Sequence, residues 1–164
     1  MGGYRSMIIQ KANSDCGIGG EAIDVYAPTK DDMDLYFQTA LGQSYDSTTA
    51  HTKANWCGIW AVYILNCAGM DARWGPISGG WGVSSGWVQR HNGYEGARAG
   101  DIGYCRYING NLADHHFIIL DVAAEYDYVE CMDGNAVGPG FGTIKRIRTR
   151  SLSDINVYYE ILDS

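Results

Sequence analysis

Cys57 is the residue whose position most favours chemistry. It opens the most apolar helix that the sequence predicts, residues 56–68, and Gly58 follows it directly. The start of a helix presents unpaired N–H groups and the positive end of the helix dipole, and both stabilise a thiolate, the nucleophilic form of cysteine. These N–H groups can also hold an oxyanion, and Gly58 lets a substrate approach the backbone. The alternative interpretation is a small apolar residue in a core helix, which most cysteines are.

A thiol nucleophile needs a base. The four histidines are His51, His91, His115 and His116. The first two lie in polar, loop-like stretches and are interpreted as surface residues. The other two open a predicted strand over residues 115–122, where alternation sends their side chains to opposite faces. The face of His116 continues with apolar residues only, so the buried helix is expected to pack there and His116 to point toward Cys57. The competing interpretation of His116 is a structurally satisfied histidine at a strand edge.

A third group would fix the orientation of the imidazole. Asp133 and Asn135 end the next predicted strand and are the candidates. The signal is weak by itself, because Asn or Asp beside Gly is often only a turn former.

The order of predicted elements indicates an α+β fold. Helices are expected over residues 31–41 and 56–68, the second with Asn55 as N-cap. A Gly-, Trp- and Ser-rich stretch follows from 71 to 100, with a short helix expected over 84–90. After Gly100 the period changes to two, and strands are predicted over 101–108, 115–122, 126–132, 141–148 and 157–162. Helices followed by about five antiparallel strands are typical of α+β domains.

The length and net charge of the chain limit the classes of protein to which it can belong. The 164 residues fit one domain, in which residues 1–30 show no clear period and are interpreted as an extension. Met7 could be the natural start, with residues 1–6 then foreign to the chain. The net charge of -7 argues against nucleic-acid binding. Neither a signal peptide nor an apolar run of membrane-spanning length is visible, so no membrane association is predicted.

The remaining cysteines and a metal site are the alternative sources of chemistry. Cys16 is a rival nucleophile, although no helix follows it, and an odd total of five cysteines does not indicate a disulfide scaffold. The thiols expected in the core are Cys67, Cys105 and Cys131. No C-x-x-C pair occurs, and the adjacent His115 and His116 face opposite sides of a strand, so we expect no metal and no cofactor.

Four short blocks, in order, resemble those of CHAP-like and NlpC-type cysteine amidohydrolases. They read WCGIWAV at 56–62, ARAGDIGY at 97–104, HFIIL at 116–120 and DGN at 133–135. The resemblance implies a papain-like fold, with N-terminal helices packed on a C-terminal antiparallel sheet. It also implies a Cys57–His116–Asn135 triad, with Asp133 in reserve. The chain departs from the family at Ile118, where a small residue is usual, and in its aromatic insertion.

The resemblance implies hydrolysis of peptide or amide bonds in bacterial peptidoglycan. Trp56, Trp81 and His115 are the expected substrate contacts, and Asn55 and Gly58 are further candidates for orienting or oxyanion roles. Such an enzyme would be made in the cytoplasm and act on the cell wall after release or secretion, as a phage lysin or as an effector toxin with an inhibitor or immunity protein. The alternatives are a papain-like toxin or deamidase acting on a protein, and an inert binding module on the same fold.

Overall fold

The computed structural model describes residues 3–15, 25–42, 56–78, 80–136 and 142–162. Its helices are α1 (Tyr4–Asp15), α2 (Lys30–Leu41) and α3 (Cys57–Cys67). Its strands are β1 (Val25–Tyr26), β2 (Arg73–Ile77), β3 (Gly80–Ser84), β4 (Val88–Asn92), β5 (Ile102–Ile108), β6 (Asn111–Ala123), β7 (Tyr128–Ala136), β8 (Thr143–Arg150) and β9 (Val157–Ile161). Short 3₁₀ turns at Ala124–Tyr126 and Leu152–Asp154 complete the described elements.

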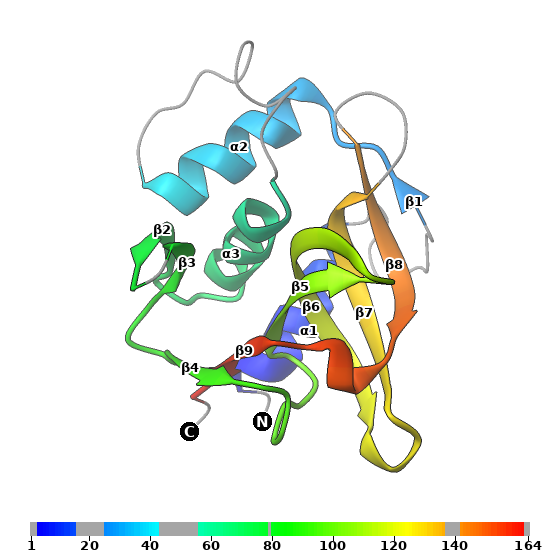
Figure 1. The fold of residues 1–164 in the computed structure, drawn as a ribbon. Coiled ribbons are helices and arrows are strands. Elements are labelled where there is room, and N and C mark those ends of the chain that lie inside the picture. Colours follow the sequence, from blue (N-terminus) through cyan, green and yellow to red (C-terminus); the bar gives the residue numbers. More distant parts are fainter. Residues whose placement is uncertain (1–2, 16–24, 43–55, 79, 137–141, 163–164) are drawn as a thin grey trace.

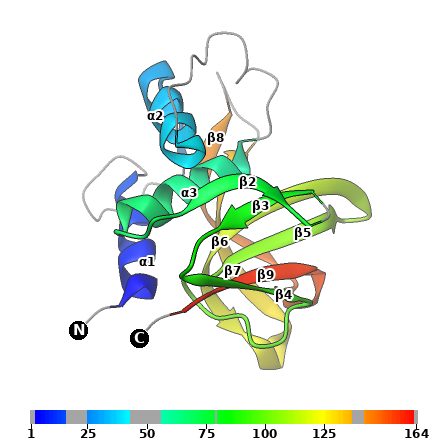
Figure 2. The same cartoon turned by 90° about the vertical axis from the view of Figure 1, so that its left-hand side faces the viewer.

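The strands form a seven-stranded antiparallel sheet in the order β1-β8-β7-β6-β5-β9-β4, with β2 and β3 forming a separate hairpin. Helix α3 lies on β6 and β7, α2 packs on the outer side of α3, and α1 contacts β6 (Figures 1 and 2). The β2–β3 hairpin follows α3 and contacts it. This arrangement brings the start of α3 directly against the sheet.

The α3 helix is buried on most sides because nearly every residue in it is apolar. Trp60, Ala61, Val62, Ile64 and Leu65 have no exposed surface. Each large apolar side chain that is fully buried stabilises the fold by roughly 1.5–3 kcal/mol. The helix that carries Cys57 is therefore a rigid part of the core.

The sheet separates two cores. On the helix side, Ile118 of β6 packs with α3, whereas Phe117 and Ile119 face a second cluster with Cys105 and Cys131. Alternation along β6 produces this division.

Helix α1 is held by a buried ion pair. Arg5 Nη1 lies 2.6 Å from Asp101 Oδ1, and the guanidinium also donates to the carbonyls of Ala99 and Ile161 at 3.0 and 2.9 Å. Asp101 is fully buried and accepts two backbone N–H bonds, from Arg98 and Ile161. The helix also buries an apolar stripe of Ile8 and Ala12, with Tyr4 and Met7 packed beside them, which the polar residues between them obscure in the sequence.

The predicted α+β class is confirmed, and so are the helices near residues 31–41 and 56–68. A hairpin at Asn109-Gly110 joins β5 to β6, with both residues in the left-handed region at φ 52° and 80°. The expected sheet of about five strands has seven, and the helix expected over residues 84–90 is wrong. Strand β3 ends at Ser84, and β4 begins at Val88 because it pairs with β9, a distant partner that local sequence does not reveal.

Candidate active site

The central sheet splits beside the start of α3. Strands β6 and β7 are paired from Ala123 and Tyr128 as far as Ile118 and Met132. Beyond this level β6 stays with β5, through His115 opposite Cys105, while β7 stays with β8. On the side where β7 has diverged, the backbone N–H and C=O groups of β6 near residue 116 do not pair with β7. They are therefore available to bond other groups.

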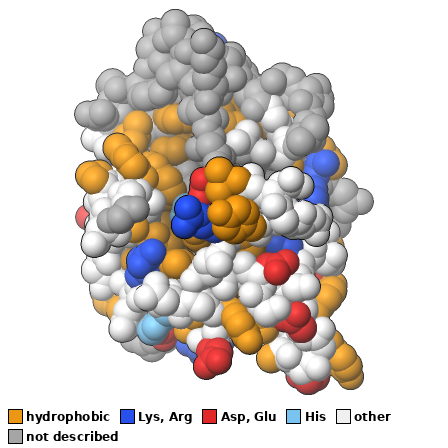
Figure 3. All heavy atoms as spheres, viewed as in Figure 1, with side chains coloured by type: hydrophobic (Ala, Val, Ile, Leu, Met, Phe, Trp, Pro, Cys, Tyr) orange, Lys and Arg blue, Asp and Glu red, His pale blue; other side chains and the backbone are white. Residues whose placement is uncertain are grey.

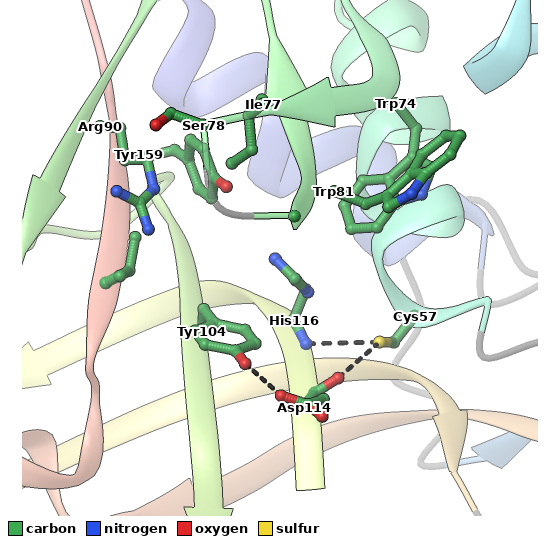
Figure 4. Close-up of a pocket in the computed structure, with 12 residues that line it drawn as sticks. Cys57, Trp74, Ile77, Ser78, Trp81, Arg90, Tyr104, Asp114, His116 and Tyr159 are labelled. Carbon is green, nitrogen blue, oxygen red and sulfur yellow. Dashed lines mark hydrogen bonds between the residues drawn. The ribbon is translucent and has the colours of Figure 1, made fainter.

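Cys57 lies at this split. It is the first residue of α3 and is 2% exposed. The backbone N–H of His116 donates a hydrogen bond to its Sγ at 3.3 Å, and the sulfur lies 4.0 Å from the carbonyl oxygen of Asp114 (Figure 4). The sulfur thus rests against the backbone of β6, between the two faces of the strand.

Two imidazoles act on the thiol. Burial of Cys57 opposes ionisation, but hydrogen bonds and positive charge from His115 and His116 outweigh it and lower the pKa of the thiol from 9.0 to about 6. Burial likewise disfavours the charged form of His115, yet Asp133 and Cys57 raise its pKa from 6.5 to about 9. Between these values, Cys57 and His115 form a thiolate–imidazolium pair.

Asp133 of β7 links His115 to a buried cation. Its Oδ2 lies 3.3 Å from His115 Nε2, at ion-pair distance but without the alignment of a hydrogen bond. Arg150 of β8 donates to both carboxylate oxygens, at 2.9 and 2.6 Å. Burial favours the neutral acid, but His115 and Arg150 override it and lower the pKa of Asp133 to about 2. The carboxylate is therefore charged at any physiological pH and orients His115.

The His116 ring turns into a pocket that Cys57 also lines (Figure 4). Its centroid lies 4.6 Å from that of Tyr104 and 4.9 Å from that of Trp74, the latter edge-on. The pocket has a volume of ≈ 340 Å³ and lies between the β2–β3 hairpin and the sheet, with Cys57 in its wall. The Tyr104 hydroxyl donates to the Asp114 carboxylate, and burial together with this carboxylate raises the pKa of Tyr104 to about 12.

The expectation that only His116 would reach Cys57 needs correction. His116 does lie on the helix side of β6, but the ring that contacts both the thiol and a β7 carboxylate is that of His115. Alternation was an incomplete guide for three reasons. Asp114 has a left-handed φ of 44°, the β5–β6 register shifts after Cys105, and the sulfur lies against the backbone where both faces are within reach.

Of the other predicted residues at the end of β7, Asn135 lines a separate cavity of ≈ 220 Å³, together with His115 and Asp133. It has a left-handed φ of 57°. Asn55 and Cys16 lie outside the described residues, and Trp56 occupies the N-cap position of α3 without a side-chain cap.

The tryptophans that line the pocket are not all those expected from the sequence. Trp56 is wrong as a substrate contact because it is fully buried, stacking on Tyr36 and packing over Gly134. Trp81 is 59% exposed and lines the pocket. Trp74 lines it too, and its ring covers Gly58 so closely that a Cβ there would be 2.3 Å away. The space next to Gly58 is therefore filled by Trp74, not left open for substrate.

Two of the other described thiols, Cys105 and Cys131, are not activated. Burial raises the pKa of Cys105 and Cys131 to about 12, and both lie in the second core, as expected for structural cysteines. Cys67 is only partly buried, at the end of α3.

Comparison with known proteins adds no relative. No family model matches the chain, no curated protein matches its sequence, and no solved structure matches its fold. Within the described residues, no group of three or more His, Cys, Asp or Glu side chains is placed to hold a metal ion. No helix in the described part is long and apolar enough to cross a membrane. Lys and Arg side chains on the face in Figure 3 are scattered singly among other groups.

Proposed function

We propose that the chain is a cysteine-dependent amide hydrolase with Cys57 as nucleophile, His115 as base and Asp133 as the residue that orients the base. The observation that carries this proposal is the pair of opposed pKa values, about 6 for the Cys57 thiol and about 9 for His115, at the start of a buried helix. A buried cysteine with no role has a raised pKa, as Cys105 and Cys131 have.

The residues define a two-stage mechanism. The thiolate attacks an amide carbonyl, and the N–H groups of the first turn of α3 stabilise the oxyanion. His115 then protonates the leaving amine, which leaves a thioester on Cys57. With the amine gone, His115 takes a proton from water, the resulting hydroxide attacks the thioester, and the thiolate leaves as the acid is released. Because Nε2 of His115 faces Asp133, Nδ1 is the nitrogen that exchanges these protons.

The proposed fold type is papain-like, and the proposed family is that of the CHAP-like and NlpC-type amidohydrolases. Two features support this: the ordered blocks between residues 56 and 135, and a nucleophile-bearing helix packed on an antiparallel sheet. His115 and Asp133 replace the His116 and Asn135 of the sequence-based triad. The proposed substrate is the peptide part of bacterial peptidoglycan.

The test is turnover of purified peptidoglycan by the wild-type chain and by Cys57→Ala, with the released fragments identified by mass spectrometry. New amine and carboxyl termini should appear with the wild type and be missing with the variant. Identical fragment patterns from both would overturn the proposed reaction on this substrate. Ammonia release from glutamine-containing proteins, measured in parallel, would point to the deamidase alternative instead.

A further inference from the structure

Arg90 is a cation in the wall of the Cys57 pocket that has no acidic partner within the described part of the chain. It belongs to β4, is exposed, and lines the pocket with Cys57 and His116. In Figure 4 it lies across the pocket from Cys57, with the His116 ring between them. Among the described residues, no carboxylate forms an ion pair or hydrogen bond with its guanidinium.

The pairing of β4 with β9 explains why no acid of β9 reaches Arg90. Arg90 is opposite Tyr159, another pocket residue, so both side chains project on the same side of the sheet. The acidic residue of β9 is Glu160, which directly follows Tyr159. Its side chain faces the other side of the sheet and pairs with His91 at 2.7 Å. Alternation thus separates the neighbouring acid from Arg90.

Two other charged groups belong to the pocket. The Asp114 carboxylate accepts the Tyr104 hydroxyl and keeps its negative charge, and the Cys57 thiolate is matched by His115. Since the chain has a net charge of -7, its general field repels anions, and an anionic substrate needs a local cation to bind.

We propose that Arg90 binds a free carboxylate of the substrate, on the far side of the pocket from the amide that Cys57 attacks. This inference rests on the proposed hydrolase and adds its substrate class: a peptide that carries a carboxylate several bonds from the scissile amide. The guanidinium matches a carboxylate with two parallel hydrogen bonds. A single Arg suits a monoanion, and the walls formed by Trp74, Trp81 and Ile77 suit an aliphatic stem between the two ends.

The experiment uses thiol-reactive probes of graded length. Iodoacetyl-glycine, iodoacetyl-4-aminobutyrate and iodoacetyl-6-aminohexanoate are each compared with the corresponding methylamide, and alkylation of Cys57 is followed by mass spectrometry. We expect one of the longer carboxylates to react about tenfold faster than its methylamide at low concentration. This preference should disappear in Arg90→Gln and be partly kept in Arg90→Lys.

Arg106→Gln is the matched control, because Arg106 carries the same charge on β5 but lies over Tyr107 and does not line the pocket. It should keep the full preference. Equal rates for every carboxylate and its methylamide, or a preference that survives in Arg90→Gln, would overturn the inference.

A second measurement does not depend on the reactivity of Cys57. N-acetyl-dialanine and its C-terminal amide are titrated into the wild type and Arg90→Gln while tryptophan fluorescence is recorded, since Trp74 and Trp81 line the pocket. Tighter binding of the acid by the wild type alone supports the inference, and equal binding of acid and amide by both proteins contradicts it. Neither measurement requires turnover. A failed hydrolase proposal would leave a carboxylate preference intact, and hydrolysis without such a preference would remove only the role of Arg90.

Discussion

His115 and Asp133 form an ion pair at 3.3 Å across the place where their strands are no longer paired. The backbone ladder between β6 and β7 ends at Ile118 and Met132, so side chains bridge the strands beyond it. Cys57 enters the same opening from α3 and accepts the His116 N–H. The split thus supplies both the space for a nucleophile and the groups that ionise it.

Substituting each of the two histidines by alanine, one at a time, distinguishes their roles. We expect His115→Ala to lower kcat/KM by a factor of about 10²–10⁴, the usual contribution of a general base. His116→Ala keeps the backbone N–H that contacts Cys57 and the whole His115–Asp133 pair, so its main effect is expected on KM through the pocket wall. Steady-state kinetics of both variants provide the comparison. A larger kcat loss in His116→Ala than in His115→Ala would restore the original assignment of the base.

The activity should have a bell-shaped pH dependence. Since the Cys57 pKa is about 6, the thiolate is lost as the pH falls through 6; since the His115 pKa is about 9, the imidazolium is lost as the pH rises through 9. A profile of kcat/KM against pH should therefore have limbs near these two values. In His115→Ala, the midpoint of iodoacetamide alkylation should move up toward the ordinary thiol value of 9.0. A wild-type midpoint already near 9 would contradict an activated thiol.

Asp133→Asn should affect both stability and activity. It leaves Arg150 buried without its counterion, and breaking such a pair costs about 3–5 kcal/mol in free energy of unfolding. The folded pKa of about 2 lies below the ordinary 3.8, so the stabilisation by Asp133 is complete above pH 3.8 and is lost as the pH falls through 2. Urea unfolding between pH 2 and 7 should show this acid-dependent loss in the wild type and a smaller one in the variant. The basic limb of activity should also move below 9, because His115 loses the carboxylate.

Gly58→Ala tests how closely Trp74 covers the start of α3. The new methyl group would lie 2.3 Å from the Trp74 ring, so the ring must move, at an expected cost of about 1–3 kcal/mol. Gly75→Ala is the matched control in β2, since no atom lies within 4 Å of its added Cβ. Urea unfolding followed by tryptophan fluorescence compares the two, and equal stability of both variants would show that the ring yields freely.

The sequence predicted the elements that are stabilised by residues next to them in the chain. Helix α2 has a capping box between Thr29 and Asp32, and ends at Gly42 with a φ of 73°, which are signals that can be read directly. Strand β4 and helix α1 were missed because part of their stability comes from distant residues: β4 pairs with β9, and the contact of Arg5 with Asp101 adds to the buried Ile8 and Ala12 of α1. Neither long-range pairing nor a buried ion pair leaves a periodic trace in the sequence.

The sequence indicated the residues of the candidate site but not which of them contact one another. Cys57 at a helix start, the His115–His116 pair and an acid near residue 133 were all visible. Which histidine joins Cys57 to Asp133 depends on the left-handed Asp114 and on where the β6–β7 ladder ends. The burial of Trp56 was hidden for a similar reason, because Gly134 of a distant strand provides its place in the core.

The position of β9 has a consequence for how the protein forms during synthesis. This strand comes after all the others in the sequence, yet it is inserted between β5 and β4 and provides Val157 and Tyr159 to the pocket. Ribosomes add about 5–20 residues per second, and a domain generally folds as a unit. The sheet therefore stays open between β5 and β4 until the last strand has been made. Completion of the pocket around Cys57 is thus tied to completion of the domain, because Val157 and Tyr159 arrive last.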